Sequence, residues 1–246
     1  MNIYCLADLH LSISHPQKDM KVFGPLWEDY HQKIHDHWQA CVKKEDLVLI
    51  PGDICWAMSL EEAMQDLAFI DKLNGQKVLI RGNHDYWWPS LAKLEKLPFK
   101  SLKFIHNNAL LIHGVGLCGS RLWDSEEFSF DEYINYRPNP QARPKASFDD
   151  AKIFDNEISR LERSISQLSP EAQVKIALCH YPPIGKDLKP TRCSSLFETA
   201  GISHVCFGHL HNLKNTMNPW GSSRGVTYHF CAADEVNFTP QKILSL

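Results

Sequence analysis

The stretch LVLIPGD, residues 47–53, joins a short apolar run directly to a glycine and a carboxylate. An apolar run of this length predicts a buried strand. Runs of the same kind occur at 2–7 (NIYCLA) and 77–81 (KVLIR), and two stretches with helical spacing lie between the three runs. This β-α-β-α-β order predicts a parallel sheet.

Helix signals fill both gaps between these strands. In the first gap, apolar residues recur three or four positions apart and predict one core-facing stripe, at Trp27, Tyr30, Ile34, Trp38 and Cys41. In the second gap, Ser59 is followed three residues later by Glu62, the form of a capping box, so a helix is expected to begin at Ser59. Asn74-Gly75 predicts the end of that helix.

The rest of the chain predicts further strands and one long helix. Strand candidates at 102–105, 109–112 and 114–118, with Asn107-Asn108 as a turn signal, indicate an antiparallel hairpin region. A helix is expected over 148–168. The last strong strands are predicted at 174–179, 204–207 and 226–231. The pattern as a whole predicts a single α/β domain spanning residues 1–246.

Residues 124–147 depart from these patterns. The segment is polar and aromatic, has no clear period, and contains Pro138, Pro140 and Pro144. Proline excludes a long helix or a central strand there. We therefore expect an ordered surface insertion or a lid over 124–147 rather than a linker between domains.

Composition limits the class of protein. The 246 residues carry 26 basic and 29 acidic side chains, and the net charge of −3 gives no support to a broad nucleic-acid-binding surface. No run approaches 18 consecutive apolar residues, so no transmembrane helix and no membrane partner are expected. The N-terminus lacks the features of a signal peptide, and none of the eight cysteines forms a C-x-x-C motif. We therefore expect a cytoplasmic protein.

Polar residues of a few types follow successive predicted strands. They are Asp8 and His10, Gly52-Asp53, Gly82-Asn83-His84-Asp85, His180, and Gly208-His209-Leu210-His211. In open α/β sheets, ligands bind beyond the carboxyl ends of the strands. These residues, which lie far apart in the sequence, are therefore expected to meet on one rim.

Carboxylate, amide and imidazole groups together suit a pair of divalent metal ions. This mixed donor set favours Mn, Fe, Zn or Co, with Mn preferred, over a thiolate-selected metal or an all-oxygen calcium site. The i, i+2 spacing of Asp8 and His10 places both side chains on one side of an extended segment. Asp53 lies centrally in the series and could bridge two ions through its two oxygens.

These motifs, in this order over residues 8–211, resemble the signature of the calcineurin-like metallophosphoesterases. The runs GDICWA at 52–57 and RGNHDYWW at 81–88 are similar to small bacterial predicted phosphohydrolases of that superfamily. The resemblance implies a sandwich of two mixed β-sheets flanked by helices. It also implies two metal sites and a catalytic role for His84. The first metal would be held by Asp8, His10, Asp53 and His211, and the second by Asp53, Asn83, His180 and His209.

Several neighbouring residues are candidates for supporting roles. Asp85 could assist catalysis by orienting an imidazole or a metal ligand, or it could only stabilise the turn. Trp87 and Trp88 could stack on the substrate or wall its pocket, or they could belong to the core. Arg121 follows a predicted strand and could bind a substrate phosphate bidentately, with an ordinary surface charge as the alternative.

The leading hypothesis is a dinuclear metal-dependent phosphoesterase acting on a small phosphate-containing substrate. A hydroxide held between both ions would attack phosphorus, and His84 would assist the leaving group. The alternatives are a phosphodiesterase or pyrophosphatase acting on a nucleotide-type substrate, a nuclease, and a metal-containing scaffold without turnover. The residue pattern leaves the ester type, the native metal, the oligomeric state and the pathway open.

Overall fold

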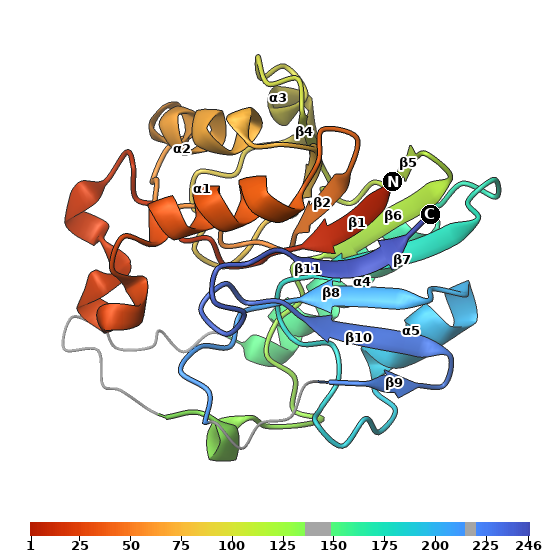
Figure 1. Cartoon of the computed structure of the whole chain (residues 1–246). Coiled ribbons are helices and arrows are strands. Elements are labelled where there is room, and N and C mark those ends of the chain that lie inside the picture. Colours follow the sequence, from red (N-terminus) through yellow and green to blue (C-terminus); the bar gives the residue numbers. More distant parts are fainter. Residues whose placement is uncertain (136–148, 215–219) are drawn as a thin grey trace.

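Two β-sheets lie face to face and carry helices on their outer sides (Figure 1). The computed structural model describes residues 1–135, 149–214 and 220–246. The first sheet contains β1 (Asn2–Cys5), β2 (Leu47–Ile50), β3 (Gln76–Leu79), β4 (Leu102–Phe104) and β11 (Gln241–Ser245). Its strand order is β11-β1-β2-β3-β4, with β11 antiparallel to β1 and the other pairs parallel.

The second sheet is mixed in the same way. Its strands are β5 (Leu110–Ile112), β6 (Val115–Ser120), β7 (Val174–Cys179), β8 (His204–Phe207), β9 (Ser222–Ser223) and β10 (Val226–Phe230). Their order is β5-β6-β7-β8-β10-β9, with antiparallel pairs at the two edges and parallel pairs between them. The predicted sandwich of two mixed sheets is confirmed.

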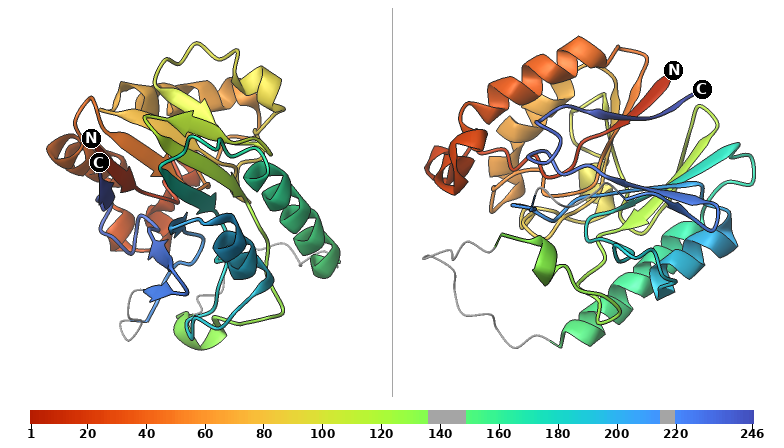
Figure 2. Two further views of the ribbon diagram at one scale, coloured as in Figure 1. Left: turned by 90° about the vertical axis from the view of Figure 1, so that its right-hand side faces the viewer. Right: turned by 60° about the horizontal axis from the view of Figure 1, so that its bottom comes forward.

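Helices cover the outer face of each sheet. The α-helices are α1 (Tyr30–Cys41), α2 (Leu60–Lys72), α3 (Leu91–Leu94), α4 (Asp150–Ile165) and α5 (Arg192–Ala200). Short 3₁₀ turns are η1 (Pro16–Lys18), η2 (Met20–Phe23), η3 (Pro25–Trp27) and η4 (Asp131–Tyr133). Figure 2 shows α1 and α2 on one side of the sheets and α4 and α5 on the other.

The alternation of side chains along the strands builds three apolar layers. Tyr4 packs with the helices on the outer side of the first sheet, whereas its neighbour Cys5 packs between the sheets. Ala177 and Ile176 divide in the same way in the second sheet. Because each helical stripe has one apolar sheet face to cover, the layers fix the order helix, sheet, sheet, helix.

The helix signals of the N-terminal half hold in the structure. Ser59 caps α2, and a complete capping box joins it to Glu62. Ile34 and Trp38 of the predicted stripe are fully buried on α1, whereas Trp27 lies in η3, before that helix begins. Two elements of the sandwich, α5 and β11, were not predicted.

The predicted hairpin region needs a correction. Asn107-Asn108 does not join two antiparallel strands, because β4 belongs to the first sheet and β5 to the second. The hairpin lies one strand later, between β5 and β6, with His113 at φ 49° and Gly114 at φ 81°. Two successive positive φ angles match the twist of paired strands, which is why the tight turn forms there.

The segment predicted as an insertion or lid is described only in its first half. Residues 124–135 include η4, and Ile134 forms an isolated antiparallel bridge with Leu213. Residues 136–147 of the predicted segment lie outside the described residues. No helix in the described ranges is both long and apolar enough to cross a membrane.

Candidate metal centre

The loops that follow the parallel strands of both sheets meet at one rim. Asp8 and His10 follow β1, Asp53 follows β2, and Asn83 follows β3. The second sheet supplies the histidines that follow β7 and β8, which are His180, His209 and His211. All seven predicted ligands therefore converge, although they come from strands far apart in the chain.

One cluster joins Asp8, His10 and His211. Their potential ligand atoms lie within 4.8 Å of one another. The Nε2 atoms of His10 and His211 are 3.2 Å apart, and Nε2 of His10 lies 3.7 Å from Oδ2 of Asp53. Four side chains thus surround one point with oxygen and nitrogen atoms.

A second cluster joins Asp8, Asp53 and His180, with ligand atoms again within 4.8 Å of one another. Oδ1 of Asn83 lies 2.6 Å from Nε2 of His180 and 3.1 Å from Nδ1 of His209. The two clusters share carboxylates and are therefore adjacent. This arrangement suits two neighbouring ions.

Partners on the far side of two imidazoles fix which nitrogen faces the centre. Nδ1 of His180 lies 3.0 Å from the carbonyl oxygen of Pro51, which can only accept, so Nδ1 carries the proton. Nδ1 of His211 lies 2.8 Å from Oδ1 of Asp234. Each contact leaves Nε2 directed toward the clusters, as in carboxylate–histidine–metal and carbonyl–histidine–metal arrangements.

The buried carboxylates at the centre require a compensating positive charge. Asp8, Asp53 and Asp85 are all buried, and in the described ranges no lysine or arginine forms an ion pair with any of them. Burial raises the pKa of Asp8 well above its usual value, and Oδ1 of Asp8 is buried without a hydrogen-bond partner. Grouped buried carboxylates are costly without a compensating positive charge.

The imidazoles are in the form that binds metals. Burial lowers the pKa of His10, His180 and His209 well below the usual value, so these rings are neutral. The unprotonated Nε2 of His180 faces an amide oxygen of Asn83, and two acceptors at 2.6 Å repel each other unless a cation lies beside both. The residues present therefore fit divalent metal ions.

His211 differs from the other histidines. Burial opposes its charged form, but Asp234, Asp8 and Asp53 outweigh burial and raise its pKa to about 10. A bound cation would take the place of that proton, because a ligating imidazole must be neutral. Asp234 was not predicted from the sequence; it lies after β10, outside every motif, and only the pairing of β10 with β8 in the second sheet brings it to His211.

Backbone geometry holds several ligands in unusual conformations. Positive φ angles occur at Asp8 (57°), His10 (44°), Asp53 (52°) and His209 (75°). Non-glycine residues in this region cost free energy and are found where function requires them. Main-chain bonds hold the strained loops together, from Asp8 N–H to the carbonyl of Gly52 (3.1 Å) and from His10 N–H to the carbonyl of Asp53 (2.9 Å).

Glycines beside the ligands are required for two different reasons. Gly52 has φ 89°, a left-handed conformation that glycine adopts readily. Gly82 has no positive φ, but a Cβ there would collide with the side chain and main chain of Asp53. At Gly208 a Cβ would collide with the carboxylate of Asp8. Space, rather than turn conformation, explains glycine at these last two positions.

His84 lies beside the clusters without joining either one. Its ring centroid is 5.7 Å from that of His10 and 4.5 Å from that of Trp56, and its Nδ1 is buried without a partner. Its main-chain N–H donates to Oδ1 of Asp53 at 2.9 Å. Burial lowers the pKa of the ring. Trp56, which also stacks on His10, is a contact that the sequence did not indicate.

Asp85 corrects the expectation of a catalytic carboxylate. Its Oδ2 accepts a hydrogen bond from the main-chain N–H of Gly82 (2.7 Å). Its Oδ1 accepts one from the main-chain N–H of Ile54 (2.9 Å) and one from the indole N–H of Trp87 (3.1 Å). Burial, followed by repulsion from Asp53, raises its pKa to about 7. Both oxygens are used to join the loops after β2 and β3, so Asp85 is a positioning residue.

The predicted substrate contacts of Trp87 and Trp88 also need correction. Both side chains are buried in the core beneath the helices of the first sheet. The Trp88 indole donates to Nδ1 of His106 at 2.7 Å. Burial in the core argues against stacking on a substrate and favours the core alternative. The exposed aromatic residue of this loop is Tyr86, 52% exposed.

Arg121 lies next to the rim, and its guanidinium already contacts two other side chains of the protein. Its NH2 lies 3.1 Å from Oε1 of Glu157, and its guanidinium stacks on Trp123 with 4.6 Å to the ring centroid. Its carbonyl accepts the main-chain N–H groups of His180 (3.2 Å) and Tyr181 (2.9 Å). The main chain of Arg121 therefore contacts the main chain of His180, a residue of the second cluster.

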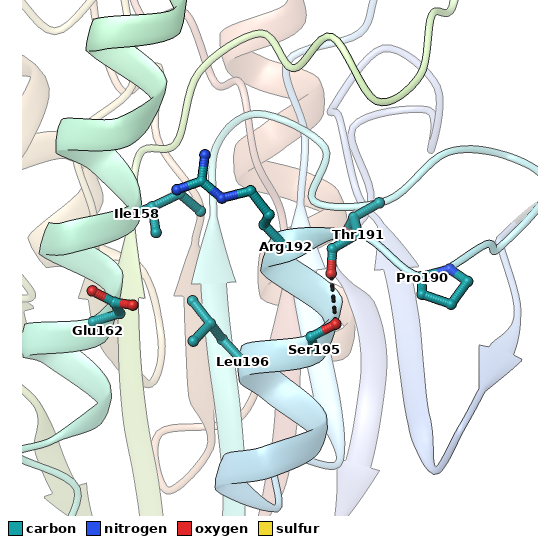
Figure 3. A pocket seen from close by; sticks show the side chains of 7 residues that line it. All are labelled: Ile158, Glu162, Pro190, Thr191, Arg192, Ser195 and Leu196. Carbon is teal, nitrogen blue, oxygen red and sulfur yellow. Dashed lines mark hydrogen bonds between the residues drawn. The ribbon is translucent and has the colours of Figure 1, made fainter.

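A cavity of about 650 Å³ adjoins the second cluster. Its lining includes His209, Tyr181, Trp123, Phe128, Asp124 and Asp150. Tyr181 packs against His209 with ring centroids 3.8 Å apart. Another hollow, of about 390 Å³, lies between α4 and α5 and contains none of the candidate ligands (Figure 3). Arg192 in that hollow is already paired with Asp155.

Comparisons with known proteins agree with this geometry. The family model described as calcineurin-like phosphoesterase matches residues 1–213. The uncharacterized protein MJ1445 of Methanocaldococcus jannaschii is 28% identical over 105 residues, which are 43% of this chain and 58% of that protein. The chain thus matches little more than half the length of that curated relative.

Two solved structures align with nearly the whole chain at low sequence identity. The phosphopantetheinyl hydrolase of Mycobacterium tuberculosis has a TM-score of 0.52 and 12% identity, with 100% of this chain and 96% of that chain covered. A protein of unknown function from Aquifex aeolicus, AQ665, has a TM-score of 0.48 and 13% identity, with 98% and 95% covered. Because the family match takes in every candidate ligand from Asp8 to His211, the chain belongs to the calcineurin-like phosphoesterases.

Proposed function

We propose that the chain hydrolyses a small phosphate ester with two divalent metal ions bound at the rim. Asp8, His10, Asp53 and His211 would hold one ion, and Asp53, Asn83, His180 and His209 would hold the other. The observation that carries the proposal is that two clusters of ligand atoms, each within 4.8 Å of one another, share the buried Asp8, and that Asp53 of the second cluster lies 3.7 Å from His10 of the first. The mixed oxygen and nitrogen donors favour Mn²⁺.

When bound, a pair of ions supplies a water of lowered pKa and neutralises charge on the phosphoryl oxygens. Side chains of the protein position the reacting group and supply the proton. Asp53 fixes the loop of His84 through the main-chain bond to Oδ1, so the imidazole stays beside the reacting group. His84 donates a proton to the departing oxygen, a role that its buried, unpartnered Nδ1 and its place outside both clusters support.

The cavity beside His209 is the proposed site for the organic part of the substrate. It adjoins the second cluster and offers aromatic walls at Trp123, Phe128 and Tyr181. Aromatic surfaces bind the carbon skeleton of a ligand, and the neighbouring carboxylates accept its hydrogen bonds. A volume of about 650 Å³ suits a small molecule.

Two further features of the proposal rest on composition. A net charge of −3 supports a small phosphate compound, rather than a nucleic acid, as the partner. Eight free cysteines, seven of them buried, support a cytoplasmic location. Cell fractionation with an antibody against the chain tests the location.

The test compares the wild type with His84→Ala on aryl phosphate mono- and diesters in the presence of Mn²⁺. We expect kcat to fall by about 10²–10⁴-fold because the proton donor is lost, while metal content is unchanged. His35→Ala is the matched control, since His35 lies on α1 with its side chain 45% exposed, and it should retain full activity. Equal traces of hydrolysis from wild type and His84→Ala would favour a scaffold without turnover.

A further inference from the structure

A small pocket lies between the edges of the two sheets, next to the metal centre. Its volume is about 70 Å³. We call it the arginine pocket, and its polar lining is Arg81, His106, Ser120, Arg121, Glu157 and Arg160. Arg81 follows β3, Arg121 follows β6, and Glu157 and Arg160 belong to α4. Three arginines thus surround a single carboxylate.

Both carboxylate oxygens of Glu157 already accept hydrogen bonds from neighbouring side chains. Oε1 lies 3.1 Å from NH2 of Arg121 and 2.6 Å from NH1 of Arg160, and Oε2 accepts the hydroxyl of Ser120 at 2.6 Å. The side chain is 2% exposed. This buried carboxylate therefore orients Arg121 and Arg160, and neither of its oxygens forms an ion pair with Arg81.

Arg81 is the third arginine, and no carboxylate of the described residues contacts its guanidinium directly. In the described ranges it makes no hydrogen bond and no ion pair, and its Nε is buried without an acceptor. A guanidinium remains charged at any ordinary pH, and burying it without an anion is costly.

Other groups in the pocket are donors as well. Nε of Arg121 is also buried without a partner. Nδ1 of His106 accepts the Trp88 indole, so in the neutral ring the proton is on Nε2. The lining therefore carries three permanent positive charges against one negative charge, with several donors unused. That is the chemistry of an oxyanion site.

The pocket and the metal centre share their backbone. Arg81 precedes Asn83 by two residues in the loop after β3, and the carbonyl of Arg121 accepts the N–H of His180. Asn83 and His180 are two candidate ligands of the second ion. An anion held by Arg81 would therefore lie on the same rim as a phosphoryl group held by the metals.

We propose that the arginine pocket binds an oxyanion, and that this oxyanion is a second phosphate or carboxylate group of the substrate. The volume of about 70 Å³ admits one small oxyanion and not a nucleoside. The assignment to the substrate rests on the proposed function, whereas oxyanion binding by the pocket does not. The substrate class is thus a phosphate ester with a second anionic group.

Calorimetric titration with inorganic phosphate tests the pocket in the full-length, Mn²⁺-loaded chain. We expect the wild type to bind one more phosphate than Arg81→Gln, or to bind it at least about tenfold more tightly, since a charge-assisted contact is lost. Arg163→Gln, which removes the same charge from an exposed position of α4, is the matched control and should match the wild type.

The outcomes separate this proposal from the function. A fall from two bound phosphates to one supports both the pocket and the metal centre, and a fall from one to none supports the pocket alone. Equal binding by wild type and Arg81→Gln overturns the proposal. If Arg81→Gln does not fold, Arg160→Gln replaces it, because that side chain is 47% exposed and its loss is easily tolerated.

Kinetics distinguish a substrate group from a free anion. For an alkyl bisphosphate, Arg81→Gln should raise KM about tenfold or more with little change in kcat. For the monophosphate of the same alkyl chain, KM should not change. If phosphate binding is lost while KM is unchanged for both compounds, the pocket holds a free anion and the assignment to the substrate is wrong.

Discussion

The two sheets contribute to the rim in different ways. The first sheet supplies mainly oxygen ligands, Asp8, Asp53 and Asn83, on loops with positive φ angles and main-chain bonds between them. The second sheet supplies imidazoles, and partners such as Pro51 and Asp234 hold the rings. The comparison shows that ligands of the first sheet are held mainly by bonds between loops, whereas the rings of His180 and His211 are oriented by the carbonyl of Pro51 and the carboxylate of Asp234. Neither half of the centre is complete alone.

The largest effect is expected in the first sheet, at the carboxylate that both clusters approach. Asp53→Asn should lower kcat/KM by at least about 10³-fold, because both ions lose a charged ligand worth several kcal/mol. Metal content by elemental analysis should fall with activity. Asp36→Asn, at an exposed carboxylate of α1, is the control and should bind metal normally. Retention of both ions in Asp53→Asn would contradict a shared carboxylate.

Gly82→Ala tests whether the first sheet depends on backbone spacing. A Cβ at Gly82 would meet Asp53, whereas a Cβ at Gly221 would have no neighbour closer than 3.9 Å. Displacing a ligand by about 1 Å can cost about 10²-fold in rate, which is the loss expected for Gly82→Ala. Gly221→Ala should be active. Equal activities of the two variants would show that the loop adjusts freely.

Asp234→Asn tests the side-chain partners of the second sheet. The amide keeps the shape of the residue but removes the charge that lies 2.8 Å from Nδ1 of His211. Metal affinity should weaken about 10–100-fold, as for other carboxylates that orient a ligating histidine. Competition with a chelator measures this affinity. Unchanged affinity would mean that His211 needs no such partner.

The smallest expected effect is on acid stability, in the second sheet away from the rim. Nδ1 of His204 on β8 and Nε2 of His229 on β10 are 3.0 Å apart. Burial, followed by His204, lowers the pKa of His229 to about 4 from the usual 6.5. The unfolded chain therefore binds this proton first, so stability is lost as pH falls from about 6.5 to about 4 and not above that range.

His229→Gln should remove part of this loss. The free energy of unfolding should decrease from pH 7 to pH 4.5 in both proteins. This decrease should be smaller in the variant by roughly 1–2 kcal/mol, a figure reduced because His229 is partly exposed. Urea titrations at a series of pH values measure the difference. Parallel pH profiles for the two proteins would show that His229 titrates normally.

The strands and the ligands could be predicted because both are encoded locally. An apolar run followed by a short polar motif defines each strand end, so Asp8, Asp53, Asn83 and His180 could be found from sequence, and the structure brings them together. Roles that depend on packing could not. Trp87 is adjacent to the motif of His84, yet its burial follows from the layers around it.

Dependence on packing also explains why the roles of Asp234, Arg81 and Asp85 were not evident from the sequence. Asp234 carries no motif and reaches His211 only because the end of β10 packs beside that of β8. The surroundings of Arg81 are evident only when α4 and both sheets are in place, because its neighbours in the arginine pocket come from several elements. Asp85 looks like a catalytic neighbour of His84 in sequence, but its hydrogen bonds show a bracing role.

An anomalous-scattering map of crystals grown with Mn²⁺ tests the central claim most directly. Two peaks are expected, about 3.5–4 Å apart, one among Asp8, His10 and His211 and the other among Asn83, His180 and His209, with Asp53 between them. A map without a peak at these side chains, or with a single ion bound elsewhere, would contradict the account.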